Sequence, residues 1–418
     1  MERQLETNKL LGFLDGSPTQ FHAAANVMDA LQRVGYVRLF EDRRWELTAG
    51  GRYFVSRNES SVIAFCVPRQ PMPSMSFRMV AVHLDSPLLK LKLKGLELSK
   101  ACIYQIPVDV YGGPIISTWL DRPLGIAGLL CQGTENRLFN LPDVAVIPNA
   151  AVHFNRSIND KGAVYNPQTE LNAIVGCAGF IGLESLAIPE DAADDSELFL
   201  YDSTKATLLG PEHDMINASR LDNLLSAFAA LVALPEHVSE NSQSVPLAFF
   251  ADNEEVGSLT LQGADSNFLP CVLQRILCAF NGSHEDFCIS MANSRMISAD
   301  AAHAEHPSYT KYYEPNYAPK MGHGIALKKN TKFRYASNGR DCAWFRALCD
   351  NAGIPCQDFI NRADMPCGST VGASLSAALG VSCVDIGVPM LAMHSIRETA
   401  ALQDVFGLQR VCEAFWMV

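Results

Sequence analysis

The chain has 418 residues, of which 48% are hydrophobic and 19% are charged, and its formal net charge is -12. This composition excludes a disordered chain, and the excess of acidic residues argues against a surface for nucleic acid or anionic membranes. The length predicts roughly two to three domains.

The thirteen cysteines are scattered along the chain without a CxxC pair. This pattern indicates reduced thiols in a cytoplasmic protein rather than a disulfide scaffold. The charged N-terminal segment lacks the apolar run of a signal peptide. The longest uncharged stretch, Met365 to Val384, contains a proline, three glycines and several serines, so we expect no membrane span.

The first elements indicate an α/β layer. Residues 5–35 show the apolar spacing of helices, with Ser17-Pro18 marking the start of the second one. Ser61–Val67 and Arg78–His83 are expected to be buried strands. Strands that alternate with long helices predict a mostly parallel sheet flanked by helices.

The pattern changes after Pro87. Leu and Lys alternate along Leu89–Lys94, which is typical of a strand with one wet face. Short segments follow it: a Tyr111–Pro114 turn, strands at Leu124–Cys131, Val144–Ile147 and Val152–Asn155, and a helix at Leu171–Leu186. We predict a β-rich module over residues 93–207, inserted into an α/β domain formed by residues 1–92 and 208–418.

The α/β pattern then resumes with the helix Leu221–Leu234, which is ended by Pro235. The further elements expected are a strand at Val245–Ala251, helices at Asp341–Ala352 and Gly372–Leu379, and a strand at Val381–Gly387.

Side chains able to bind metals follow or begin these apolar runs at five places: His83, Asp222, Glu254-Glu255, Asp300 and His394. Each alone is more often an ordinary polar residue at the end of an element. In open α/β sheets, however, ligands bind outside the carboxyl ends of the strands. The conjunction therefore predicts a site for a pair of divalent metals.

Seven motifs lie in order between residues 80 and 400: HLDSP, SRLDN, DNEEVGS, SADAAHAEHP, RYASN, PCGSTVG and AMHSIRE. Together they resemble the motifs of the M18 metallopeptidases, the aspartyl aminopeptidases. The resemblance implies a zinc-exopeptidase-like α/β domain with an inserted β-rich dimerisation domain, assembled as a homododecamer built from dimers. It also implies an aminopeptidase that removes N-terminal Asp or Glu from peptides.

The resemblance further implies a ligand set for two ions. Asp222 would bridge both metals, His83 and Asp300 would complete one set, and Glu255 and His394 would complete the other. Zinc is the expected metal, although nitrogen and oxygen ligands also accept manganese or cobalt.

The resemblance also assigns roles to Glu254 and Asp85. Glu254 would be the general base that activates a water bridging the metals. Asp85 would hydrogen-bond the far nitrogen of His83. Glu254 and Glu255 can both reach one site only if the backbone leaves strand geometry there, because successive strand side chains point to opposite faces. A cis peptide bond between Asp222 and Asn223 is also implied.

Substrate selection is assigned by the resemblance as well. The basic run from Lys328 to Arg334 would by itself be interpreted as a solvated strand edge. In M18 enzymes the position of Lys328 lines the pocket for the first side chain and pairs with its carboxylate. Tyr335 and the Gly368–Thr370 turn would line the same pocket. His153, in the inserted module, would reach the active site of a neighbouring subunit, with a role as a zinc ligand as the alternative.

Other functions have less support. No GxSxG motif follows a strand, Cys367 has no nearby base in the sequence, and the phosphate-binding glycine motifs are absent. Two alternatives remain: a related tetrahedral aminopeptidase with neutral or broad specificity, and a shell-forming binding protein without activity. The binding protein is disfavoured because every ligand position and the base are intact.

Overall fold

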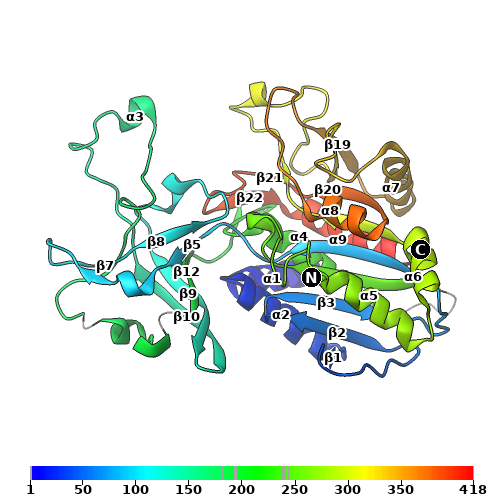
Figure 1. Cartoon of the computed structure of the whole chain (residues 1–418). Coiled ribbons are helices and arrows are strands. Elements are labelled where there is room, and N and C mark those ends of the chain that lie inside the picture. Colours follow the sequence, from blue (N-terminus) through cyan, green and yellow to red (C-terminus); the bar gives the residue numbers. More distant parts are fainter. Residues whose placement is uncertain (1, 181, 193–194, 237–241, 243, 418) are drawn as a thin grey trace.

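The computed structural model describes residues 2–180, 182–192, 195–236, 242 and 244–417. Figure 1 shows an α/β part on the right and a β-rich module on the left, from which an arm carrying the short helix α3 (Ile158–Lys161) projects.

The α/β part is built on a sheet of nine strands in the order β1-β2-β3-β15-β4-β16-β20-β18-β19. The strands β15, β4, β16 and β20 at its centre are parallel to one another, whereas β2–β3, β3–β15 and β18–β20 pair antiparallel. The strand bounds are β1 Val37–Leu39, β2 Arg52–Arg57, β3 Ser61–Cys66, β4 Ser76–His83, β15 Ser244–Ala251, β16 Arg295–Ala299, β18 Ile325–Lys329, β19 Cys356–Ile360 and β20 Ser382–Gly387.

Helices cover both faces of this sheet. Along β4, Val80 and Val82 pack into one hydrophobic core while Met79 and Ala81 pack into another, because successive strand side chains alternate. The first core includes residues of α1 (Glu2–Asp15), α2 (Gln20–Arg33), α4 (Leu221–Ala233), α7 (Gly339–Ala352) and α9 (Leu402–Met417). The second includes residues of α5 (Phe268–Ala279), α6 (His284–Asn293) and α8 (Val371–Leu379). Burial on both faces explains why these strands are continuous apolar runs in the sequence.

The β-rich module has its own core and two sheets, ordered β10-β9-β12-β5-β8 and β11-β7-β6. Their bounds are β5 Leu88–Leu91, β6 Glu97–Leu98, β7 Tyr104–Ile106, β8 Val108–Tyr111, β9 Leu124–Gln132, β10 Glu135–Ala145, β11 Ala173–Gly176 and β12 Glu197–Asp202. The first strand of the module, β5, therefore precedes residue 93, where the boundary was expected.

A small sheet in the order β13-β14-β22-β21-β17 lies next to the module in Figure 1. Its strands are β13 Thr207–Leu209, β14 Met215–Ala218, β17 Ala302–His303, β21 Pro389–Leu391 and β22 Glu398–Ala401.

Two sequence predictions inside the module are wrong. Val152–Asn155 forms turns instead of a strand, and its Val152 and Phe154 side chains are exposed, so no core selects an extended segment there. Leu171–Leu186 is not a helix: it contains β11 and a short 3-10 turn, separated by Gly179 and Gly182. These two glycines have φ values of 93° and 112°, which are incompatible with a right-handed helix.

All thirteen cysteines are free. Within the described ranges, no helix combines the length and the apolar character that crossing a bilayer needs.

Candidate metal centre and active site

Segments that are far apart in the sequence meet at one edge of the nine-stranded sheet. His83 is the last residue of β4, Asp300 directly follows β16, and a turn after β15 carries Glu254 and Glu255. Because β15, β4 and β16 are parallel neighbours, their carboxyl ends lie side by side.

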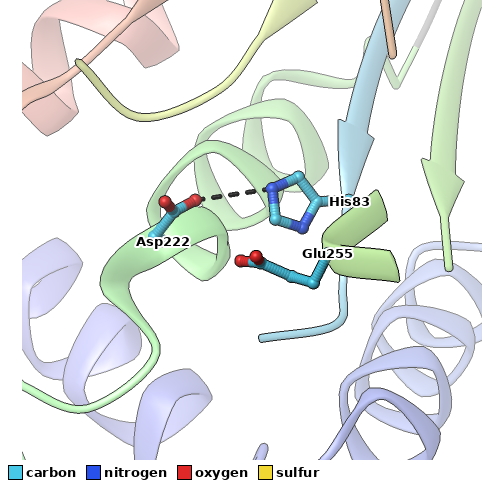
Figure 2. Close-up of side chains that lie close together, drawn as sticks. All are labelled: His83, Asp222 and Glu255. Atoms are coloured by element: carbon cyan, nitrogen blue, oxygen red, sulfur yellow. Dashed lines mark ion pairs between the residues drawn. The ribbon is translucent and has the colours of Figure 1, made fainter. Parts of the chain in front are cut away.

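Asp222 lies between two histidines, His83 and His394. Its Oδ1 is 3.4 Å from Nε2 of His83, and its Oδ2 is 3.7 Å from Nε2 of His394. Figure 2 shows His83 at the end of its strand, facing Asp222 at the start of α4, with Glu255 beside them. The peptide bond from Asp222 to Asn223 is cis, as the family resemblance implies. Each carboxylate oxygen of Asp222 therefore faces a different imidazole.

Each of these histidines also lies close to a second carboxylate. Asp300 Oδ1 is 3.5 Å from His83 Nε2, and Glu255 Oε2 is 3.4 Å from His394 Nε2. One ligand atom from each of His83, Asp222 and Glu255 also lies within 4.8 Å of the other two. The five side chains thus form two groups that share Asp222.

The spacing of these atoms fits cation ligands better than direct hydrogen bonds. Their N···O distances of 3.4–3.7 Å exceed the usual hydrogen-bond length. Two ligands bound tetrahedrally to one zinc at about 2.0–2.2 Å are about 3.3–3.6 Å apart. Asp222 Oδ1 is also buried without a hydrogen-bond partner. The residues present therefore fit a pair of divalent ions.

Negative charge is concentrated at the site and shielded from water. Burial, reinforced by neighbouring carboxylates, raises the pKa of Glu254 to about 8 and that of Glu255 to about 7. Burial opposes the charged form of Asp300, yet Lys328 and His83 hold its pKa well below the usual range. A pair of divalent cations would neutralise this charge and keep the carboxylates ionised.

Asp85 connects His83 to the turn that carries the two glutamates. Nδ1 of His83 is 3.0 Å from the main-chain oxygen of Asp85 and 3.4 Å from its Oδ1. The two carboxylate oxygens of Asp85 accept the backbone N–H groups of Glu254 and Glu255, each at 3.1 Å. Asp85 therefore positions the glutamate turn as well as the imidazole ring.

Glu254 and Glu255 both reach the site because the chain leaves strand geometry just before them. Asn253 has a φ of +62°, and Glu254–Val256 forms a 3-10 turn. In a continued strand the two glutamates would point to opposite faces of the sheet. Here both line the same cavity.

That cavity has a volume of about 350 Å³ and extends from the metal-competent residues to Lys328. Its wall includes the expected pocket residues Tyr335 and Gly368. Lys328 is only 2% exposed, and its Nζ lies 3.2 Å from Asp300 Oδ2 and 5.4 Å from the centre of the Tyr335 ring. A buried ammonium group therefore stands beside the candidate metal centre.

His153 is not part of this cavity within one chain. It lies between β10 and α3 in the sequence of the module, and its side chain is exposed.

The module contributes contacts that the sequence analysis did not foresee. The Tyr111 hydroxyl donates to Asp85 Oδ2 at 2.7 Å and accepts from Asn253 Nδ2 at 2.9 Å. The main-chain oxygen of Gly113 lies 3.0 Å from Nδ1 of His394. In the sequence, Tyr111–Pro114 carried only the signal of a turn.

Glu398 is another buried carboxylate that the sequence did not single out. It accepts the backbone N–H of Asp222 at 2.9 Å and that of His394 at 2.7 Å. The only signal for it was its place at the end of the AMHSIRE motif.

Comparisons with known proteins identify the family. Residues 13–416 match the family model described as aminopeptidase I zinc metalloprotease (M18). The chain belongs to the M18 family. A probable M18 family aminopeptidase 2 from Ectopseudomonas mendocina (strain ymp) is 40% identical to this M18 chain over 425 residues, which cover 97% of each protein.

Solved structures share the fold of this M18 aminopeptidase. A cryo-EM structure of an Ape4 and Nbr1 complex contains a chain with a TM-score of 0.92 and 33% identity, and the match covers 100% of this chain and 86% of that one. A structure of an S. cerevisiae mApe1 dodecamer matches with a TM-score of 0.82 and 24% identity, over 100% of this chain and 98% of that one, and this likeness shows the fold alone. The predicted family, α/β fold class and metallopeptidase activity are confirmed.

Proposed function

We propose that this M18 aminopeptidase holds two divalent cations, most readily zinc, and removes N-terminal Asp or Glu from peptides. The observation that carries the proposal is the arrangement of His83 with Asp300, and of His394 with Glu255, on either side of Asp222. Asp222 would be the shared ligand and each flanking pair would complete one set.

The chain's own residues would supply the proton transfers. When bound, a pair of divalent cations polarises the scissile carbonyl and lowers the pKa of a coordinated water. Glu254 would accept the proton of the attacking water and return it to the leaving amine. Its backbone amide is held by Asp85 at 3.1 Å, which orients the side chain towards the cavity.

Lys328 would select the first side chain. Its ammonium is buried in the cavity wall, where it can pair with the carboxylate of an N-terminal Asp or Glu. A charge-assisted hydrogen bond contributes about 1.5–3 kcal/mol, or roughly 10- to 150-fold in selectivity. Tyr335 and the Gly368–Thr370 turn would shape the rest of the pocket.

A preference for neutral side chains is the alternative that one observation favours. Lys328 already has a carboxylate partner, because its Nζ lies 3.2 Å from Asp300 Oδ2. If that pair persists with metal bound, Lys328 would only orient Asp300, and the pocket would not require an acidic substrate. A shell-forming binding protein without activity has no such support.

We also propose a homododecamer built from dimers, in the cytoplasm. The exposed apolar side chains Val152 and Phe154 in the module support an assembly in which this segment contacts another copy. His153 would then reach the cavity of a neighbouring subunit and stabilise the reacting carbonyl oxygen. The thirteen free cysteines agree with a reducing compartment.

The test is to measure metal content per chain together with turnover of Asp-, Glu-, Leu- and Ala-p-nitroanilides, with and without a chelator. Two ions per chain and chelator-sensitive turnover of the Asp and Glu substrates are expected. Turnover of the Leu substrate but not of the Asp substrate would support an aminopeptidase with neutral specificity. If no turnover is sensitive to the chelator, the binding protein without activity is the remaining alternative.

A further inference from the structure

Glu398, the first residue of β22, ties together two segments that approach the candidate metal centre from different directions. Its Oε2 accepts the backbone N–H of Asp222 at the start of α4, at 2.9 Å. Its Oε1 accepts the backbone N–H of His394, at 2.7 Å. Glu398 is 2% exposed, so both carboxylate oxygens are used inside the protein.

The two amides that Glu398 binds belong to irregular backbone. Asp222 has a ψ of 106° inside the first turn of α4, and the preceding Arg220 has a φ of +60°. His394 itself has a φ of +65°, in the left-handed region that residues with a side chain rarely adopt. Neither amide can join an ordinary helix or strand ladder in this conformation, so each needs an acceptor from elsewhere.

The position of Glu398 is set by the small sheet. Glu398 pairs with Ala218 at the end of β14, and β14 leads directly into the segment that carries Asp222. In this register the Glu398 carboxylate reaches the backbone N–H groups of both Asp222 and His394. The two positions are therefore linked through a single side chain.

We propose that Glu398 is a positioning residue that presets the separation of Asp222 and His394 for metal binding. The inference rests on the proposed function, since it assumes that these two residues are metal ligands. Outer contacts that orient ligands typically change metal affinity by about 10- to 100-fold. Glu398 does this through the main chain alone, whereas Asp85 also contacts the His83 ring and the Gly113 carbonyl contacts the His394 ring.

The variant Glu398→Gln separates this role from simple packing. Glutamine has nearly the same volume but only one acceptor oxygen, so its amide nitrogen would face one of the two N–H donors. We expect zinc to bind about 10- to 100-fold more weakly in competition with a chromogenic chelator. Glu398→Asp keeps the charge but is one methylene shorter, so we expect it to keep only one of the two contacts and to weaken zinc to a smaller extent.

Asp404 on α9 provides the matched control. It is also a buried carboxylate that accepts two backbone N–H groups, those of Gly322 at 2.5 Å and Gly324 at 2.8 Å. It does not line the cavity that holds the candidate ligands. Asp404→Asn should therefore lower thermal stability as Glu398→Gln does while leaving zinc affinity unchanged.

The experiment compares zinc dissociation constants and metal-free melting temperatures of the wild type and the three variants. Weaker zinc binding confined to the Glu398 variants supports the proposal. Wild-type affinity in Glu398→Gln, or an equal loss in Asp404→Asn, would overturn it. A His83→Ala variant tests the foundation separately: if it binds zinc as the wild type does, the ligand set of the proposed function is wrong, whatever Glu398 does.

Discussion

The α/β part and the β-rich module contribute to the candidate active site in different ways. The α/β part provides the side chains that can bind metals or move protons, among them His83, Asp222 and Glu254. Within one chain, the module's contacts with these residues and their supports include the Tyr111 hydroxyl, the Gly113 main-chain oxygen and the Ile115 N–H, which donates to the main-chain oxygen of His394 at 2.8 Å.

The residues proposed to react or bind metals therefore belong to the α/β part, and the module contributes residues that hold them in position. Three of the groups that take part in the proposed chemistry, His83, Glu254 and Asp300, lie at or just after the ends of neighbouring parallel strands, where the sheet brings them together. Asp222 joins them from the start of α4. The groups from the module hydrogen-bond to residues such as Asp85 and His394 but do not line the cavity. Within one chain, changes in the α/β part should therefore abolish steps of the reaction, and changes in the module should only weaken them.

The largest expected effect is that of Glu254→Gln. The amide cannot accept the proton of the attacking water, so we expect kcat to fall about 10²- to 10⁴-fold. Both metals should remain bound, because Glu254 is outside the proposed ligand set. Steady-state kinetics and metal analysis check this, with Glu255→Gln as the variant that should lose metal. An unchanged kcat would refute the assignment of the base.

His153→Ala tests whether the module acts chemically on a neighbouring subunit. If His153 helps to stabilise the reacting oxygen across a subunit interface, its loss should lower kcat roughly 10²-fold. Mixing His153→Ala and Glu254→Gln subunits should then restore part of the activity, because some sites receive an intact residue from each. If mixed assemblies stay as inactive as the separate variants, His153 does not act between subunits.

The sequence could predict the chemical groups but not their support, and the reason is physical. His83 and Asp300 follow apolar strands, so their convergence follows from the rule for parallel sheets. Tyr111 and Glu398 each make two hydrogen bonds, and one partner of each, Asn253 and Asp222 respectively, is far away along the chain. No local periodicity encodes such contacts, because they depend on how one sheet is placed against another.

The module also shows where periodicity misleads. The apolar positions of Leu171–Leu186 resemble a helix, but Gly179 and Gly182 adopt positive φ values that end any helical path. In the α/β part the corresponding predictions for α4, α7 and α8 are confirmed, because the cores bury one side of α7 and α8 and nearly all of α4.

Lys328→Ala addresses selectivity and should have an intermediate effect. Loss of the ammonium removes one charge-assisted hydrogen bond, so kcat/KM for Asp-p-nitroanilide should fall about 10- to 150-fold relative to Ala-p-nitroanilide. Lys329→Ala is the control, since Lys329 lies next in β18 and pairs with Asp358. If Lys328→Ala lowers kcat/KM equally for both substrates, Lys328 orients Asp300 and does not bind the side chain of the substrate.

Tyr111→Phe should have the smallest effect, and it measures what the module contributes within its own chain. The change removes the hydroxyl that joins Asp85 to Asn253, but Asp85 keeps its two backbone donors at 3.1 Å. We therefore expect a loss of about 1 kcal/mol, or roughly fivefold in kcat/KM, for acidic and neutral substrates alike.

Tyr201→Phe is the matched control for Tyr111→Phe, because the Tyr201 hydroxyl donates to Asn140 inside the module. It should lower the melting temperature without changing kcat/KM. A fall of 10²-fold or more in Tyr111→Phe would mean that the hydroxyl takes part in the reaction itself. The division between chemistry in the α/β part and support from the module would then no longer hold within a single chain.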